Sequence, residues 1–256
     1  MSHLAATDIA AAAVQLMRAG RWAAAADLLT AAIPDDPDDP DDPDDPDERD
    51  LLALTRAEVA VDRDFGRTTD HATAALAAVP GDSWDLAMLT FRKDYANALF
   101  QAGDPDLRDR AHTLIEQAPD DARRGTASFW AGAVADNVYE QPAEACARYE
   151  VALELGEKCG DELLVAQALR HLGHHAHAAG DLALARSQWE RSTELFQKAG
   201  QLRPALAQQA SLAVLLRDEG DLAGSRALAA ETNRWARQLD VPFITQQTAE
   251  LMAVPA

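Results

Sequence analysis

Hydrophobic and small residues recur every three or four positions through the second half of the chain, most regularly between Asp161 and Asp240. This spacing places them on one face of an α-helix. Residues 161–200 form two such stretches joined at Ala179-Gly180-Asp181, and residues 201–240 repeat the design with a turn at Glu219-Gly220-Asp221. A helical hairpin that recurs at a fixed period indicates a solenoid, in which each hairpin buries its apolar face only against its neighbours.

The residue types within the 161–200 unit explain how each hairpin closes. Gly180 ends the first helix, since glycine reaches the left-handed conformation without a side-chain penalty. Asp181 then caps the second helix by accepting hydrogen bonds from exposed backbone N–H groups. Gly173 costs roughly 1 kcal/mol of helix propensity relative to alanine, so we expect a neighbouring helix to pass close to its backbone. The first helix carries one stripe of small and apolar positions, namely Leu169, Leu172, Gly173 and Ala176.

This arrangement resembles the tetratricopeptide repeat. The matching positions are Leu172-Gly173, the Gly180-Asp181 turn, Ala185 and Trp189. Gln197 replaces the proline with which that family usually ends the second helix, and the period is 40 residues rather than about 34. Longer repeats that end as residues 194–200 do look like the arrays of bacterial signal-transduction ATPases and transcriptional regulators. The resemblance implies a right-handed superhelix whose concave groove binds a protein or peptide.

The small residue that follows each turn aligns six hairpins along the chain, with anchors at Ala25, Ala72, Ala111, Ala145, Ala185 and Ser225. We therefore predict an all-α fold, a right-handed tetratricopeptide-like superhelical solenoid of about six helical hairpins plus a C-terminal capping helix. The hairpins run over residues 7–33, 49–79, 83–118, 121–160, 161–200 and 201–240. As domains, we expect an N-terminal hairpin in 1–33, a linker in 34–48, the repeat array in 49–240 and the cap and tail in 241–256.

Residues 34–48 interrupt the hairpins with aspartates and prolines at a strict three-residue period. Each proline disfavours helix in the residue before it, so we expect an extended, disordered linker. An electrostatic contact and a calcium site are the alternatives, since aspartates are calcium ligands, but the glycine of sharp calcium loops is missing. The segment Pro34–Asp50 carries half of the formal net charge of -20.

The remaining composition narrows the class of protein. Hydrophobic residues make up 48% of the chain and aromatic residues 5%, and abundant alanine and leucine favour helices. An acidic chain without a basic stripe is a poor ligand for nucleic acid or anionic membranes.

Cys146 and Cys159 lie near the two ends of one predicted helix, about 20 Å apart and beyond disulfide reach. Because the sequence contains no leader or membrane-spanning run, we expect a cytoplasmic protein, and its excess of arginine over lysine suggests a bacterial source.

The most enzyme-like feature is the run from Arg170 to His177, which contains four histidines. His171 and His175 are four residues apart, and His174 and His177 are three apart, so each pair shares a helix face and could place two imidazoles on zinc. A zinc site needs a further ligand, and the HExxH pattern is absent. In the tetratricopeptide register, His174 and His177 face the groove, whereas His171 and His175 face adjacent helices or solvent.

The same register predicts which side chains line the groove: Lys93, Asn97, Phe100, Trp130, Asn137, Gln167, Arg170, His174, His177 and Arg217. Lys93 and Asn97 resemble the first half of the carboxylate clamp of chaperone-binding tetratricopeptide domains, but Ala131 stands where that clamp needs its next asparagine. A groove aromatic such as Trp130 is a typical partner anchor, although it could equally pack between repeats.

Together these features predict a scaffold or adaptor that binds a protein or peptide on the groove, with no cofactor and with regulation as one use. No phosphate-binding glycine loop, nucleophile elbow or CxxC motif is present. The alternative is a small-molecule- or metal-binding helical protein, or an enzyme, that uses the cluster His171–His177. The sequence does not define an oligomeric state.

Overall fold

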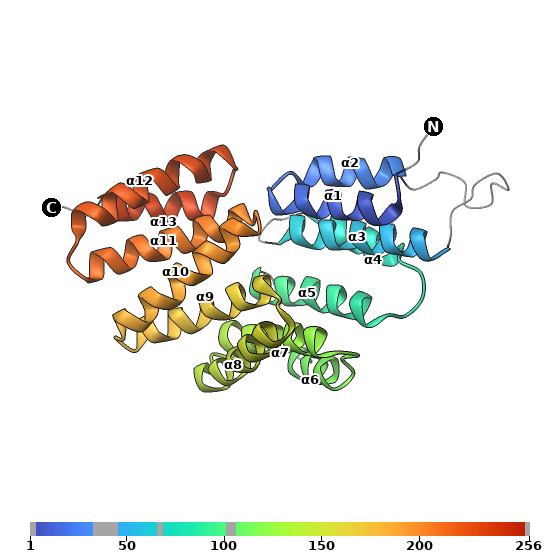
Figure 1. Ribbon diagram of the computed structural model, residues 1–256, viewed down its shortest axis with the longest axis horizontal. Coiled ribbons are helices and arrows are strands. Elements are labelled where there is room, and N and C mark those ends of the chain that lie inside the picture. Colours follow the sequence, from blue (N-terminus) through green and yellow to red (C-terminus); the bar gives the residue numbers. More distant parts are fainter. Residues whose placement is uncertain (1–3, 33–45, 66–68, 101–105, 254–256) are drawn as a thin grey trace. The chain divides into compact units, whose positions relative to one another are not determined.

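The computed structural model describes residues 4–32, 46–65, 69–100 and 106–253. Within these ranges the regular elements are thirteen helices (Figure 1). They fall in the six predicted hairpins and the predicted C-terminal cap, which confirms the all-α repeat fold. The chain divides into two compact units, residues 1–119 and 120–256. None of the helices in the described ranges has the length and apolar character that crossing a bilayer requires.

The first unit is built from three helix pairs around an alanine- and leucine-rich core. Its helices are α1 (Ala6–Arg18), α2 (Trp22–Ala32), α3 (Pro46–Asp64), α4 (His71–Ala77), α5 (Trp84–Phe100) and α6 (Leu107–Glu116). Ala13, Ala25 and Leu29 are fully buried and pack with Val59 of α3. The Trp22 indole N–H donates to the Asp62 carboxylate at 2.7 Å, which ties α2 to α3. The predicted Asp–Pro linker lies outside the described residues up to residue 45, and its last three residues form the start of α3.

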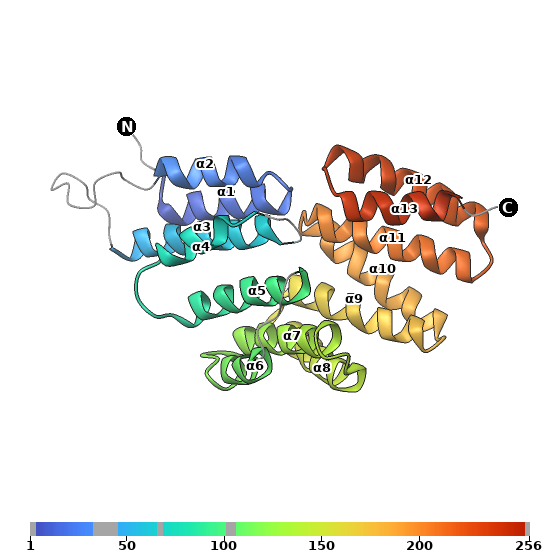
Figure 2. The same cartoon turned by 180° about the vertical axis from the view of Figure 1, so that it is seen from behind.

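The second unit is a continuous run of antiparallel helices, each packed on its neighbours in sequence (Figures 1 and 2). Its helices are α7 (Asp121–Asn137), α8 (Pro142–Cys159), α9 (Glu162–Ala178), α10 (Leu182–Lys198), α11 (Leu202–Asp218), α12 (Leu222–Gln238) and α13 (Pro242–Ala253). Aspartate side chains cap several of these helices: Asp161 accepts from the Leu163 and Leu164 N–H groups, and Asp181 accepts from the Leu184 N–H. This satisfies backbone donors that a helix N-terminus leaves unpaired.

Left-handed residues occur every twenty positions and set the length of each helix in this unit. The turns within hairpins use Glu140, Gly180 and Gly220, with φ of 54°, 81° and 92°. The turns between hairpins use Gly160, Gly200 and Asp240, with φ of 70°, 71° and 52°. Four of the six positions hold glycine, which adopts this conformation without strain, whereas a non-glycine residue there costs about 1–2 kcal/mol.

Each of the first two hairpins of this unit closes over an aromatic ring that occupies the space left by a glycine. A Cβ added to Gly173 would lie 2.5 Å from Cδ1 of Trp189, and one added to Gly132 would lie 2.8 Å from Cε1 of Tyr149. The neighbouring helix expected close to the backbone of Gly173 is α10, and the Trp189 side chain of α10 fills the space at that glycine. Trp189 is 1% exposed, and its indole N–H donates to the Arg170 carbonyl at 3.0 Å.

The glycine–aromatic pairs also show that α7 is one residue out of register with the predicted alignment. Gly132 and Gly173 are 41 residues apart, as are the first residues of α7 and α9, whereas Tyr149 and Trp189 are 40 apart. The extra residue lies in the turn after α7. The position equivalent to Arg170 is consequently Phe129 rather than Trp130.

Replacing Gly173 by alanine should lower the free energy of unfolding by up to about 2 kcal/mol. Overpacking against the fixed Trp189 ring costs roughly 1–3 kcal/mol, and the helix propensity of alanine returns about 1 kcal/mol. Urea unfolding measures the change. In a Trp189→Phe background the smaller ring leaves room, so the penalty should shrink; an equal penalty in both backgrounds would contradict the packing described.

Replacing Glu140 by glycine should raise the free energy of unfolding by about 1 kcal/mol, since it relieves a left-handed non-glycine residue. The matched control is Glu154→Gly on the exposed face of α8, which should lose about 1 kcal/mol of helix propensity. Thermal unfolding of the two variants should therefore shift in opposite directions. Destabilisation by both would contradict the strain at Glu140.

Candidate functional site

Histidines of α9 contact carboxylates of two other repeats, one in the preceding repeat and one in the following repeat. On one side, Oδ2 of Asp136, near the end of α7, lies 3.2 Å from Nε2 of His175 and 3.8 Å from Nδ1 of His171. The same oxygen accepts a hydrogen bond from the Tyr149 hydroxyl of α8 at 3.2 Å. Groups from α8 and α9 therefore converge on one carboxylate oxygen of α7 and hold the two hairpins together.

His171 lies among aromatic rings. Its ring stacks on Tyr149 with centroids 4.7 Å apart and meets the edge of Phe129 at 5.5 Å. Burial lowers the pKa of His171 to about 4, against the opposing influence of Asp136. Burial would likewise raise the pKa of Asp136, but the contacts with His171, His175 and Tyr149 outweigh it and hold that pKa below its ordinary value. The pair is therefore a neutral imidazole beside a carboxylate at neutral pH.

On the other side, His177 reaches the next repeat. Its Nε2 lies 2.9 Å from Oδ2 of Asp218 at the end of α11, and Nε of Arg217 donates to the other oxygen of Asp218 at 2.8 Å. The hydrogen bond from Arg217, the largest influence, holds the pKa of Asp218 below its ordinary value. The rings of His174 and His177 both lie against Trp189, at 5.9 and 5.3 Å. Of the predicted groove residues, His177 thus joins two repeats through its ring nitrogen, and Arg217 orients the Asp218 carboxylate from within α11.

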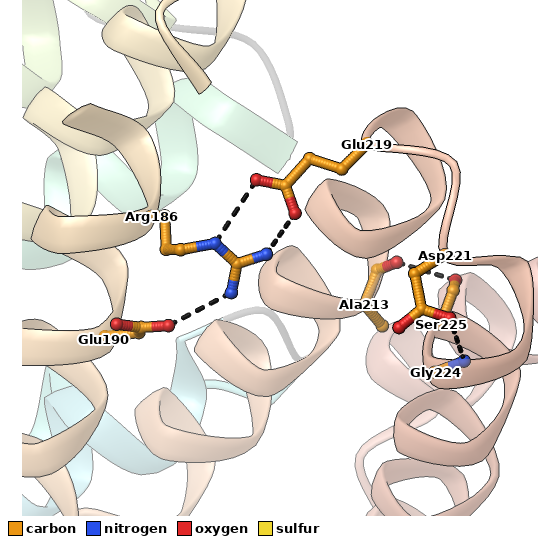
Figure 3. A network of polar contacts seen from close by, with 7 residues as sticks. All are labelled: Arg186, Glu190, Ala213, Glu219, Asp221, Gly224 and Ser225. Carbon is orange, nitrogen blue, oxygen red and sulfur yellow. Dashed lines mark hydrogen bonds and ion pairs between the residues drawn. The ribbon is translucent and has the colours of Figure 1, made fainter. Parts of the chain in front are cut away.

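Further ion pairs reinforce the same junctions. Arg186 of α10 binds Glu219, which follows α11, through two nitrogens, and its third nitrogen contacts Glu190 at 3.1 Å (Figure 3). The neighbouring turn is closed by the Asp221 carboxylate, which accepts from the Gly224 N–H at 2.8 Å. The Ser225 hydroxyl donates to the Ala213 carbonyl at 2.7 Å, joining α12 to α11 (Figure 3).

The other predicted groove residues of this unit occupy different surroundings. Trp130 is half-buried and packs against the core cluster that contains Phe129 and Tyr149, which agrees with packing between helices. The Asn137 amide donates to the Ala133 carbonyl of its own helix at 3.0 Å. Gln167 and Arg170 are half-buried and His174 is exposed, all on α9.

The described residues hold no group of three His, Cys, Asp or Glu side chains placed to share a metal ion. In this part of the chain His171 and His175 instead face the aspartate and tyrosine described above, and His177 faces Asp218. Ring nitrogens of His171, His175 and His177 thus face carboxylates of neighbouring repeats.

The predicted residues of the first unit, in contrast, come together around one pocket. Lys93, Asn97 and Phe100 lie on successive turns in the C-terminal half of α5, facing the end of α3 and the connection to α4. Phe100 is 60% exposed although it is a large hydrophobic residue. The opposite wall carries Asp64, Phe65 and Asp70. An exposed aromatic ring beside an amide and charged groups is a typical recognition surface.

Asp64 organises this opposite wall. Its Oδ1 accepts from the Thr69 hydroxyl at 2.6 Å and contacts Nδ1 of His71 at 2.9 Å, while Oδ2 accepts from the Ala72 N–H at 2.8 Å. Burial would raise the pKa of Asp64, but these hydrogen bonds outweigh it and hold the pKa below its ordinary value. Asp64 therefore stays a carboxylate and fixes the start of α4 against the end of α3.

The sequence analysis did not single out the carboxylates that organise either region. Asp136 lies 39 residues before His175, and Asp218 lies 41 residues after His177. Each pair is thus separated by about one repeat, and an acid–histidine match at that separation is the signal that could have identified them. Asp64 gives no such signal, because its partners Thr69, His71 and Ala72 lie only five to eight residues further along the chain.

Acidification should destabilise the second unit through His171. Since its folded pKa of about 4 is below the ordinary value of 6.5, the unfolded chain takes up the proton first. Its stabilising contribution is complete above about pH 6.5 and is lost as the pH falls towards 4, by about 2–3 kcal/mol. Urea unfolding at pH 6.5 and 4.5 measures the loss. His171→Phe, which keeps the ring stacking, should lose less, whereas His112→Gln at an exposed position of α6 should behave like wild type. A loss in His171→Phe as large as in wild type would contradict this assignment.

No protein-family model matches the sequence, and a comparison with curated proteins also finds no match. Among solved structures, the chain is similar to a signal transduction ATPase with numerous domains from Pyrococcus horikoshii, which has a tetratricopeptide repeat sensor. The TM-score is 0.52 at 14% sequence identity, and the match covers 93% of this chain but 37% of that protein. A likeness at this identity shows the fold alone. The chain thus has a tetratricopeptide-like helical repeat fold.

Proposed function

We propose that this chain is a helical repeat scaffold that binds a peptide segment of a protein partner at the pocket on α5. The observation that carries the proposal is the meeting of Lys93, Asn97 and the exposed ring of Phe100 around one pocket. These residues were expected on the binding face from repeat register alone. A register-based expectation and an independently formed pocket therefore point to the same part of the first unit.

The chemistry of these three side chains suits an extended peptide. The Phe100 ring offers an apolar surface that loses water on binding. Asn97 both donates and accepts hydrogen bonds, as a peptide backbone requires. Because α5 is a regular helix of seventeen residues, the three side chains are held in fixed relative positions, and binding loses little conformational entropy.

The second unit adds further helical repeats to the scaffold in this proposal, and the predicted groove residues Gln167, Arg170 and His174 of α9 are not part of the α5 pocket. His177 and Arg217 are engaged with Asp218, so they contribute to repeat geometry. The similar solved protein carries its repeats as a sensor, and a sensing or regulatory use of the scaffold follows by analogy. The free cysteines Cys146 and Cys159 fit a reducing compartment such as the cytoplasm.

A phage-displayed library of random peptides, selected on the immobilised full chain, tests the proposal. We expect a recurrent peptide to emerge, and Phe100→Ala to weaken its binding about tenfold or more, because it removes the central apolar contact. Asn97→Ala should weaken it to a smaller degree. Fluorescence anisotropy with the labelled peptide gives the dissociation constants.

The matched control is Trp235→Ala, since Trp235 is also a large exposed aromatic residue, at 45%, but lies on α12. It should leave the dissociation constant unchanged. Circular dichroism should show unchanged helicity for all three variants. The proposal fails if no peptide is enriched, or if the enriched peptides bind the Phe100→Ala variant as tightly as wild type.

A further inference from the structure

We infer that the peptide bound at the α5 pocket is basic, and that an arginine or lysine side chain enters the pocket between the Phe100 ring and the carboxylates of Asp64 and Asp70. This inference rests on the proposed function and specifies the chemistry of the partner. It is carried by three features of the pocket wall, which are its formal charges, the helix ends that border it and its aromatic faces.

The formal charges favour a cation. Asp64 and Asp70 contribute two carboxylates to the pocket wall, and Lys93 contributes one ammonium group. The hydrogen bond from Thr73, together with a smaller influence of the Lys93 charge, holds the pKa of Asp70 below its ordinary value. Lys93 is therefore already balanced by a carboxylate of the same pocket. A cationic side chain of the peptide would therefore meet an excess of negative charge in the pocket. An anionic side chain would be repelled by both carboxylates.

The helix ends add to this preference. The lining residues Asp64 and Phe100 are the last residues of α3 and α5, and the C-terminus of a helix carries a partial negative charge. The N-terminus of α4 also lies at the wall, but two of its N–H groups are satisfied by the wall carboxylates, since Asp64 accepts from Ala72 and Asp70 accepts from Thr73. The two C-terminal helix ends therefore add negative partial charge to the pocket.

The aromatic faces provide the remaining partner for a cation. The rings of Phe65 and Phe100 meet edge to face with centroids 6.0 Å apart, and Phe65 stacks on Tyr95 behind it at 6.4 Å. An arginine or lysine positioned over such a ring is attracted by the negative face of its π-system. Arginine should be preferred, because its planar guanidinium can stack on a ring and bind a carboxylate together.

The charge of the whole chain acts in the same direction. A formal net charge of -20 attracts basic partners over long distances and repels acidic ones. This differs from the carboxylate clamp that Lys93 and Asn97 resemble in sequence, in which the lysine would bind an acidic group. The presence of Asp70 beside Lys93 is what separates the two possibilities.

The test is to select peptides from the random library on the full chain and to measure how charge-changing variants of the pocket affect their binding. Peptides selected on the full chain should be enriched in arginine and lysine relative to the unselected library. With the labelled consensus peptide, Asp70→Asn should weaken binding about threefold, and asparagine keeps the capping of α4 intact. Lys93→Gln should tighten binding by a similar factor, because it removes a like charge. Asp82→Asn, an exposed aspartate outside the pocket, is the matched control and should change the affinity little.

Opposite results separate this inference from the proposed function. The selected peptides could instead be acidic, with Lys93→Gln weakening their binding and Phe100→Ala abolishing it. The pocket would then still be a peptide site, but the inference that the peptide is basic would be overturned. If basic peptides bind equally well to wild type and to Phe100→Ala, the attraction is a general effect of the acidic chain, and the inference is likewise overturned. If no peptide of either charge is enriched, both the proposed function and the inference are wrong.

Discussion

The second unit depends on the packing of a large aromatic ring into the space where the facing helix has no Cβ. Trp189 fills this space over Gly173, and Tyr149 fills it over Gly132. Because the ring buries a large area within one hairpin, it fixes the separation of the two helices through a contact inside that hairpin. The third hairpin replaces the pair by two alanines at equivalent positions, Ala213 and Ala229, both fully buried.

Polar contacts between repeats build on this packing. Asp136 and Asp218 each bind a histidine of α9 from opposite sides, and Arg186 adds a two-point contact to Glu219. The cost of burying Asp136 is offset by the Tyr149 hydroxyl and the His175 ring, each 3.2 Å from one of its oxygens, since a buried charge is tolerated only when it is paired and hydrogen-bonded. The histidine cluster, which suggested metal chemistry in sequence, is thus best understood as the set of side chains that joins three consecutive repeats.

Features with a local cause were predictable from the sequence. The turns at Gly180 and Gly220 follow from the conformational freedom of glycine, and the helix pairs follow from apolar periodicity. The one-residue shift of α7 was not predictable, because the turn before α8 uses Glu140 in a left-handed conformation where the next repeats use glycine. The placement of Asp70 beside Lys93 depends on the irregular connection between α3 and α4, for which repeat register gives no information. Which charged side chains share the pocket could therefore be seen only in the structure.

Internal polar contacts join the repeats of the second unit, and we propose that a partner peptide occupies the pocket between α3 and α5 in the first unit. Amide hydrogen exchange of the full chain, with and without a saturating selected peptide, tests this claim most directly. The account predicts slowed exchange in the last turns of α3 and α5 and at the start of α4, with α9 unchanged. Protection confined to α9, or to the second unit alone, would contradict it.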